Sequence, residues 1–491
     1  MEIVFSDAKN GELTCSLGGK FVHSAYNPSK EAEQFVAGLA APFNPSAVII
    51  IEPALSSCAP FLRERFPQTA LYAIRICAAF SAYDGAWDAV FAAGDTLGSR
   101  LFERLGEETI CSALFIAWPP SERLFPDETK LAWQAIKTAV LKSCDVLATR
   151  SFFAKRWIKN AVRFCARVQH PALLHKGTAD ILIAASGPSL RTSLPHIAAF
   201  RARFFVIALS SALLPLLHKG ITPDLVLSTD GGFWAKKHLA YCGDGFPHIP
   251  FALAAEGAAP AALLETQTVV PLWYDDSIAV PMLRTCNIPA MRAARNGTVS
   301  GTALDFALAL TSGNVYLCGL DLATAQGFQH TQPNALEQHH AAHDDRLRTK
   351  HTRLAASATV AQGSLAVYRD WFVSVSERWE NRVFRLSDSY DFAHDLGKIR
   401  DVGWDIFSAS DAKKNQHFPS IEQIRLTSAD RKNVLAELLP ELFATDRYDR
   451  ELYPIETLMQ QRAATEAERI AYGRTVSQGK AQFVRELLNL L

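Results

Sequence analysis

The sequence predicts an α/β protein whose central domain is a doubly wound parallel sheet, and two observations support this. Short apolar runs rich in β-branched residues, such as Ala47-Val48-Ile49-Ile50-Ile51, are typical of strands buried on both faces. Helical stretches separate these runs, and that alternation indicates parallel strands joined by crossover helices.

The chain divides into three zones. Residues 1–169 are expected to form a smaller N-terminal α/β domain, residues 170–410 the central domain, and residues 411–491 a helical C-terminal region. At about 150 residues per domain, this length allows two to four domains.

In the first zone, Asn27 and Pro28 predict the start of a helix, because Asn is a favoured N-cap and Pro is favoured at the first helical position. The strand at 47–51 is followed by a turn without glycine, residues 52–55. A phosphate could not approach that backbone closely, so we assign no dinucleotide to this unit.

In the last zone, Val434, Leu438 and Leu442 recur every four residues, which predicts an amphipathic helix. Thr427, with Asp430 three residues later, is the expected cap of that helix.

The composition argues against several functional classes. Lys+Arg number 50 and Asp+Glu number 50, and a balanced charge argues against nucleic acid as a partner. No apolar run approaches the ~18 residues that span a bilayer, and the N-terminus has no basic, apolar leader, so we expect a cytoplasmic protein without membrane contact. The nine cysteines include no C-x-x-C pair, which favours reduced thiols.

Four predicted strands of the central domain end in small polar residues. Their spans are 181–185, 204–209, 225–229 and 315–319, and the residues that follow include Ser186-Gly187-Pro188-Ser189, Ser210-Ser211, Asp230-Gly231-Gly232 and Leu320-Asp321. In open parallel sheets, ligands bind at the carboxyl ends of the strands. The loop 296–302 precedes a further predicted helix, where backbone N–H groups could hold a phosphate. Each piece alone also fits a plain turn or cap, but together they predict one ligand site at one edge of the sheet.

These segments resemble a known family. The matching stretches are IAASGPSL at 183–190, HKGITPDLVLSTD at 218–230, the loop 296–302, LCGLDL at 317–322 with His330, and YRDWF at 368–372. The family is the motility accessory factor (Maf) flagellin glycosyltransferases, with an MptE-like central domain. The resemblance covers residues 20 to 410 in outline.

The resemblance implies a central domain similar to that of bacterial sialyltransferases. It implies inverting transfer of a nonulosonic acid of the pseudaminic or legionaminic type from a CMP-sugar to Ser or Thr of flagellin, in support of flagellar assembly and motility. Flagellin and the CMP-nonulosonic acid are the implied partners; no cofactor is required, and Mg²⁺ could assist. The strand ends and the resemblance together give these expected donor-binding residues: Gly187, Pro188, Ser189, Ser210, Asp230, Asn296, Gly297, Thr298, Ser300, Gly301 and Thr302.

An inverting transfer needs a base for the acceptor hydroxyl and electrostatic support for the leaving phosphate. The expected catalytic residues are His330, His351 and Asp321. The sialyltransferase pattern expects a histidine shortly before the helix of Tyr368, and this sequence has Thr359 there. The general base therefore stays open between His330 and His351.

Residues 330–353 hold five histidines and resemble a mobile lid, with a plain solvated loop as the alternative. Its basic residues, Arg346, Arg348, Lys350 and Arg353, could meet an anionic donor. We assign no metal site, because the spacing fits no sharp metal-binding motif.

Two other functions compete with the transferase. The first is a 6-hydroxymethyl-dihydropterin pyrophosphokinase, in which Asp230 and Asp321 would hold Mg²⁺ against ATP phosphates. The second is a non-catalytic factor that binds flagellin.

Overall fold

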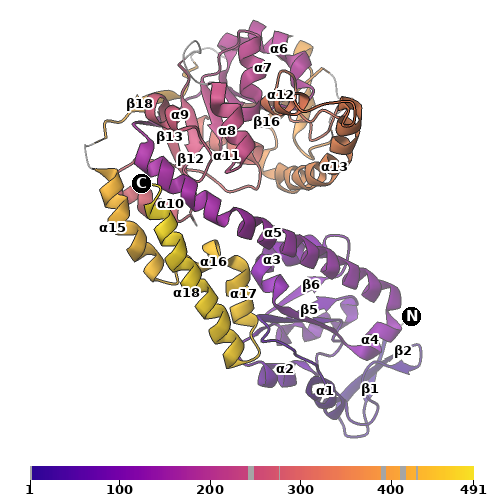
Figure 1. The fold of residues 1–491 in the computed structure, drawn as a ribbon. Helices are drawn as coiled ribbons and strands as arrows, with labels where there is room; N and C mark the ends of the chain where they lie inside the picture. The colour runs from indigo at the N-terminus through magenta and orange to yellow at the C-terminus, as the bar shows by residue number, and fades with distance from the viewer. Residues whose placement is uncertain (1–2, 242–247, 276, 389–393, 410–415, 427–429) are drawn as a thin grey trace. The chain divides into compact units, whose positions relative to one another are not determined.

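The computed structural model describes residues 3–241, 248–275, 277–388, 394–409, 416–426 and 430–491. These residues form two compact units, one of residues 1–154 and 446–482, the other of residues 155–445 and 483–491. Figure 1 draws the chain from indigo to yellow. These two units are defined by how compactly their residues contact one another. The division of the sequence into three zones stays a prediction.

The first unit contains two sheets. A three-stranded antiparallel sheet has the order β1 (Ile3–Asp7), β2 (Leu13–Leu17), β3 (Lys20–Phe21). A four-stranded parallel sheet has the order β6 (Ala89–Ala92), β5 (Ala70–Arg75), β4 (Ala47–Ile51), β7 (Ala113–Ala117). Its helices are α1 (Pro28–Ala37), α2 (Ala59–Arg65), α3 (Leu97–Cys111), α4 (Pro119–Leu124), most of α5 (Pro126–Arg167), α16 (Asp449–Leu452), α17 (Pro454–Arg462) and most of α18 (Glu466–Leu488).

Local sequence signals explain several of these elements. All five residues of β4 are buried, as the continuous apolar run predicts. The predicted start of α1 is confirmed, because the Asn27 side chain accepts a hydrogen bond of 2.8 Å from the Lys30 amide and Pro28 opens the helix.

The second unit is built on an 11-stranded sheet. The order is β17 (Arg400–Val402), β16 (Val383–Leu386), β15 (Val315–Cys318), β9 (Ile181–Ala184), β10 (Phe205–Leu209), β11 (Leu225–Ser228), β12 (Phe251–Ala254), β13 (Thr268–Trp273), β8 (His170–His175), β18 (Ser420–Gln423), with β14 (Met291–Arg292) beside β13. Its helices are α6 (Leu190–Ala199), α7 (Leu213–His218), α8 (Phe233–His238), α9 (Ala261–Thr266), α10 (Ala279–Thr285), α11 (Val299–Leu310), α12 (Ala335–Ala341), α13 (Lys350–Val375), α14 (Trp404–Ala409) and α15 (Arg431–Ala444), with the last turns of α5 and α18.

The predicted mixed α/β fold, its parallel sheet and its helical C-terminal region are confirmed. Every strand pair of the large sheet is parallel except β18 with β8. The apolar strand residues on one face of this sheet share a single hydrophobic core with residues of α11. That core fixes the strand ends, and so it positions the loops that follow them.

The C-terminal region differs from the prediction in two details. It is not wholly helical, because β18 adds an antiparallel edge strand and packs Ile421 against the core. The predicted cap Thr427 lies outside the described residues. Asp430 is the N-cap of α15, and it accepts bonds of 3.2 Å and 3.4 Å from the amides of Lys432 and Asn433.

The eight described cysteines are all free thiols. Across the described parts of the chain, no helix combines the length and apolar character that a membrane crossing needs.

Candidate functional site

The order of the large sheet reverses at β9. The chain passes from β9 to β10 on one side, whereas β15, which follows much later, pairs with β9 on the other side. The loops after β9 and β15 therefore leave the sheet in opposite directions, and ligands of open α/β sheets bind at such a reversal. The predicted loops 186–189 and 319–321 lie at this point.

Gly187 lies where the loop after β9 contacts the loop after β15. Its amide donates a bond of 2.7 Å to the Gly319 carbonyl. A Cβ atom at Gly187 would lie 2.5 Å from that carbonyl oxygen and 2.7 Å from Asp321 Oδ2, closer than real contacts allow. Only glycine fits here, because the neighbouring strand end occupies the space of a side chain.

Asp321 fastens the same two loops together. Ser189 donates its amide to Asp321 Oδ2 at 2.6 Å and its hydroxyl to Oδ1. The carboxyl group is 1% exposed, and burial raises its pKa above the ordinary value while the bonds from Ser189 act in the opposite direction. Ser189 is the N-cap residue of α6, but its hydroxyl makes no capping bond to that helix. Both Asp321 oxygens accept bonds from Ser189, so the carboxylate holds the two loops together, and its expected catalytic role stays a prediction.

Replacing Asp321 with asparagine is expected to lower the free energy of unfolding by about 2–3 kcal/mol, because an amide nitrogen would face a Ser189 donor in a buried position. Urea unfolding measures the loss. Asp230→Asn is the matched control, since its side chain is exposed and accepts one bond from the Gly232 amide, at 2.8 Å; there we expect a change within about 0.5 kcal/mol. Equal small losses in both variants would show that the hydrogen bonds between Ser189 and Asp321 contribute little to the free energy of unfolding.

His330 lies beside the β9 and β10 strand ends. Its Nδ1 atom is 2.8 Å from Ser186 Oγ, which is in turn 2.7 Å from Ser211 Oγ. The ring of His238, on α8 after β11, meets the His330 ring edge-on at 6.2 Å between centroids. Desolvation lowers the pKa of both imidazoles to about 4, and for His238 the nearby His330 adds to the effect. Both rings are therefore neutral at pH 7, which is the form a proton acceptor needs.

The loop 296–302 enters α11 as predicted. Thr298 is the N-cap and accepts a bond of 2.9 Å from the Gly301 amide. Gly297 has φ +69°, a left-handed conformation that favours glycine. The helix packs on β9, β10, β11 and β15, and the residue after its last turn, Thr311, donates to the Ala179 carbonyl before β9. The helix therefore runs antiparallel to the strands, and its N-terminus lies at their carboxyl edge.

Several side chains of this loop have partners within the protein. Asn296 Nδ2 donates to Asp305, and Ser300 Oγ donates to Thr298 Oγ1 at 3.3 Å. Thr302 Oγ1 donates to the Ala294 carbonyl at 2.9 Å. A Cβ atom at Gly301 would lie 2.8 Å from the Trp371 ring. The side chains therefore shape the loop, and an anion would meet the N-terminus of α11 through backbone N–H groups.

The other expected donor residues lie at neighbouring strand ends. Ser210 is buried directly after β10, and the Pro188 carbonyl accepts a bond of 3.2 Å from the Arg191 amide. Asp230 follows β11 and closes a local turn onto Gly232. Asp321 instead bonds Ser189, which follows β9, two strands from β11 in the sheet, so the two carboxylates have separate partners.

Sequence reasoning missed a charged cluster beside this edge. Arg295 Nη2 lies 2.9 Å from Glu256 Oε2 and its guanidinium is 4.3 Å from the Tyr274 ring centroid. Glu256 is 3% exposed and also accepts from the Ser277 hydroxyl. The cluster places a partly exposed cation directly before Asn296. The Trp273-Tyr274 segment was the available signal, but only the fold brings it to Arg295.

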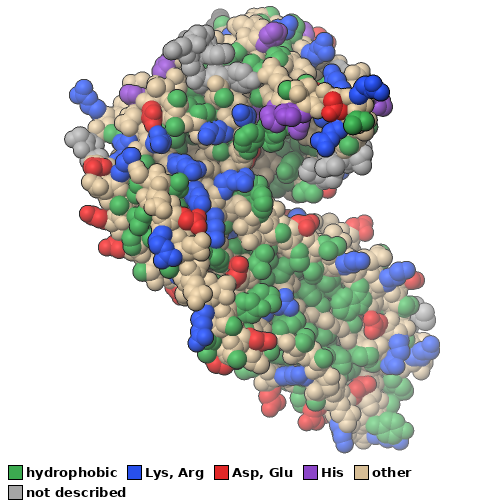
Figure 2. Space-filling view, viewed as in Figure 1, with side chains coloured by type: hydrophobic (Ala, Val, Ile, Leu, Met, Phe, Trp, Pro, Cys, Tyr) green, Lys and Arg blue, Asp and Glu red, His purple; other side chains and the backbone are tan. Residues whose placement is uncertain are grey.

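Several side chains of the expected lid, residues 330–353, already have partners within the protein. Arg353 pairs with Glu337 at 2.7 Å and with Asp344 at 2.8 Å. His339 and His340 pack against Trp234 of α8, with ring centroids 5.1 Å and 5.4 Å away. Figure 2 shows histidine side chains gathered on this face of the second unit. His351 is exposed at the start of α13, and among the described residues it makes no hydrogen bond or ring contact with His330. Among the described residues, no group of three His, Cys, Asp or Glu side chains has metal-binding geometry.

A cavity of about 770 Å³ opens beyond the neighbouring strand ends, after β16 and β17. His196 lies 3.1 Å from Asp388 and stacks on Trp404, and Asp401 and Asp405 also line the space. These carboxylates disfavour an anionic ligand there. The cavity therefore does not compete with the α11 N-terminus for a phosphate.

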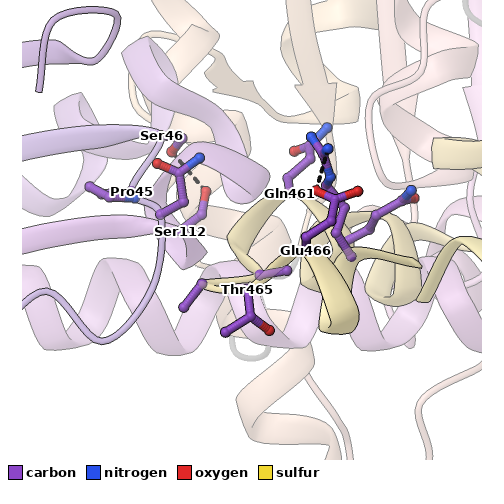
Figure 3. A pocket seen from close by; sticks show the side chains of 11 residues that line it. Pro45, Ser46, Ser112, Gln461, Thr465 and Glu466 are labelled. Atoms are coloured by element: carbon purple, nitrogen blue, oxygen red, sulfur yellow. Dashed lines mark hydrogen bonds and ion pairs between the residues drawn. The ribbon is translucent and has the colours of Figure 1, made fainter. Parts of the chain in front are cut away.

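In the described part of the first unit, the carboxyl edge of the parallel sheet is occupied by a side chain of the protein itself. Glu52 accepts the amides of Ile76 and Cys77, each at 2.7 Å, and pairs with Arg75 at 2.6 Å. A protein carboxylate thus occupies the donors that a phosphate would need. A pocket of about 520 Å³ lies at the opposite, amino ends of β4 and β7, where the hydroxyls of Ser46 and Ser112 are 2.7 Å apart (Figure 3).

Comparison with known proteins defines the class of fold. Residues 155–327 match the family model described as 6-hydroxymethylpterin diphosphokinase MptE-like. The chain is 28% identical over 347 residues to an uncharacterized protein of Treponema pallidum (strain Nichols). The match covers 69% of this chain and 74% of that protein.

A solved structure shares the fold of nearly the whole chain. It is described as the Maf glycosyltransferase from Magnetospirillum magneticum AMB-1. The match has a TM-score of 0.57 at 13% identity and covers 99% of this chain and 91% of that one. The resemblance predicted from sequence is therefore confirmed for the MptE-like domain and for the Maf-type fold.

Proposed function

We propose that this protein is a glycosyltransferase that moves a nonulosonic acid from a CMP-sugar to a Ser or Thr hydroxyl of a protein acceptor, with flagellin as the expected acceptor. One observation carries the proposal. Three features lie together at the carboxyl edge of four strands: the neutral imidazole of His330, the tight turn at Gly187 and the N-terminus of α11. The fold that brings them together is shared with a Maf glycosyltransferase.

Each part has a task in this reaction. The donor carries a phosphodiester and a carboxylate, and the N-terminus of α11 favours such anions. Gly187 lets the β9 and β15 strand ends, where the donor would bind, approach each other closely. His330 accepts the proton of the acceptor hydroxyl as the new bond to the anomeric carbon forms and CMP departs.

The match to the MptE-like family model favours a second candidate, an ATP-dependent diphosphotransferase. That reaction needs Mg²⁺ to bridge phosphates, and Mg²⁺ ligands lie about 2.1 Å from the ion. The two carboxylates expected for the task have other partners, because Asp230 accepts from the Gly232 amide and Asp321 accepts two bonds from Ser189. The remaining alternative, a non-catalytic factor, would bind the acceptor without binding CMP.

Calorimetric titration of the purified protein separates these three functions. We expect CMP to bind at micromolar concentration with or without Mg²⁺, and ATP to give no response. Binding of ATP alone, and only with Mg²⁺, would replace the proposal with the diphosphotransferase. Binding of flagellin without any response to CMP would favour the non-catalytic factor.

The pH dependence of transfer follows from the lowered pKa of His330. An ordinary histidine would give kcat/KM an acid limb near pH 6.5, where the ring gains a proton. Because desolvation lowers this pKa to about 4, the ring stays neutral down to lower pH. We expect kcat/KM to stay level from about pH 8 down to about pH 5.5 and to fall only toward pH 4. An acid limb near pH 6.5 in the stable protein would contradict this assignment.

A further inference from the structure

The hydrogen-bonded chain from Ser211 through Ser186 to His330 has a role of its own, and its interpretation rests on the proposed function. Ser186 Oγ lies within hydrogen-bond distance of two partners, His330 Nδ1 at 2.8 Å and Ser211 Oγ at 2.7 Å. Ser186 follows β9 and Ser211 follows β10. The chain therefore joins two strand ends to the loop that carries the imidazole.

The backbone fixes this loop on the same strand ends. The amide of Thr331 donates to the Ser186 carbonyl at 2.7 Å, and its hydroxyl donates to the Gly187 carbonyl at 2.7 Å. Asn334 Nδ2 donates to the Ser211 carbonyl at 3.3 Å, and its Oδ1 accepts from the Leu336 amide to cap α12. The position of the His330 ring is thus set from both sides.

The two ring nitrogens then have different roles. Nδ1 is committed to Ser186, whereas Nε2 has no hydrogen-bond partner among the described residues. The only titratable ring that packs against it in the described part of the chain is that of His238. With a proton on Nδ1 that is donated to Ser186 Oγ, the lone pair is on Nε2.

We propose that Ser186 is a positioning residue that holds the His330 ring through Nδ1, so that Nε2 receives the proton of the acceptor hydroxyl. In this step the acceptor oxygen bonds to the anomeric carbon, the bond from that carbon to the phosphate oxygen breaks, and its electron pair leaves with CMP. The hydroxyl proton moves to Nε2. Nδ1–H continues to donate to Ser186, whose own hydroxyl donates to Ser211.

A hydroxyl in this place differs from the carboxylate that often orients a catalytic histidine. A carboxylate would stabilise the protonated ring and raise its pKa, whereas a neutral hydroxyl orients the ring with little such effect. This arrangement agrees with the lowered pKa of His330, about 4.

The test compares Ser186→Ala with Ser186→Thr, which restores a hydroxyl. For Ser186→Ala we expect kcat to fall by about 10–100-fold while CMP affinity stays within about twofold, and for Ser186→Thr a recovery of most of the rate. Ser374→Ala is the control, because Ser374 is exposed on α13 and bonds only the carbonyl of Trp371. Thermal unfolding of each variant checks that the fold is kept.

A second readout does not depend on activity. Nitrogen-15 NMR of the imidazoles should show His330 as a single tautomer with its proton on Nδ1, and a mixture of tautomers in Ser186→Ala. An unchanged kcat, an unchanged tautomer, or a threonine variant as slow as the alanine variant would each overturn the positioning role. Absence of CMP binding and of transfer in the unmodified protein would instead overturn the proposed function, and the NMR result would still report on the ring.

Discussion

Replacing His330 with asparagine is expected to lower kcat for sugar transfer by about 10²–10⁴-fold, the range that loss of a general base usually produces. Asparagine keeps a polar atom near the position of Nδ1, so the bond to Ser186 can persist while Nε2 is lost. CMP affinity is therefore expected to stay within about twofold. Single-turnover transfer and calorimetry measure the two effects separately.

The matched control for this experiment is His351→Asn. His351 was an equal candidate in the sequence, but it is exposed at the start of α13 and, among the described residues, lacks a bond to Ser186 such as His330 makes. We expect this variant to retain kcat within about threefold. A large loss in His351→Asn with a normal rate in His330→Asn would exchange the two assignments.

Replacing Gly187 with valine is expected to abolish CMP binding and to lower the free energy of unfolding by about 3 kcal/mol or more. The added Cβ would collide with the Gly319 carbonyl oxygen at 2.5 Å and with Asp321 at 2.7 Å. Backbone cannot move away cheaply, so the two strand ends would separate. Urea unfolding and calorimetry with CMP measure the two losses.

Gly85→Ala is the control for the glycine experiment. A Cβ atom there would meet nothing within 4 Å, and its φ is not in the left-handed region. We expect a change within about 0.5 kcal/mol. Tight CMP binding by Gly187→Val would show that the donor does not lie at this strand end.

Many strands and helices of the second unit could be predicted from short stretches of the sequence. The runs at 181–185, 204–209, 225–229 and 315–319 form β9, β10, β11 and β15, because each buries an almost unbroken set of apolar residues. Thr298 caps α11 because its side chain satisfies a free amide in the first turn. These signals lie within a few residues of the element that they specify.

The contacts across the sheet could not be predicted in the same way. His330 is 144 residues from Ser186, and Asp321 is 132 residues from Ser189. Nothing in either segment specifies its partner, because the order of strands brings them together. The sequence therefore indicated the edge of the sheet, while the contacts of Asp321 with Ser189 and of His330 with Ser186 depended on the three-dimensional arrangement.

The most direct test of the central claim is transfer itself. The purified protein is incubated with a CMP-nonulosonate and unmodified flagellin, and intact mass and released CMP are measured together. The proposal predicts a mass increase of one or more nonulosonate residues on flagellin, with one CMP released for each residue added. CMP release without modified flagellin, or no release although CMP binds, would contradict a protein-directed transferase.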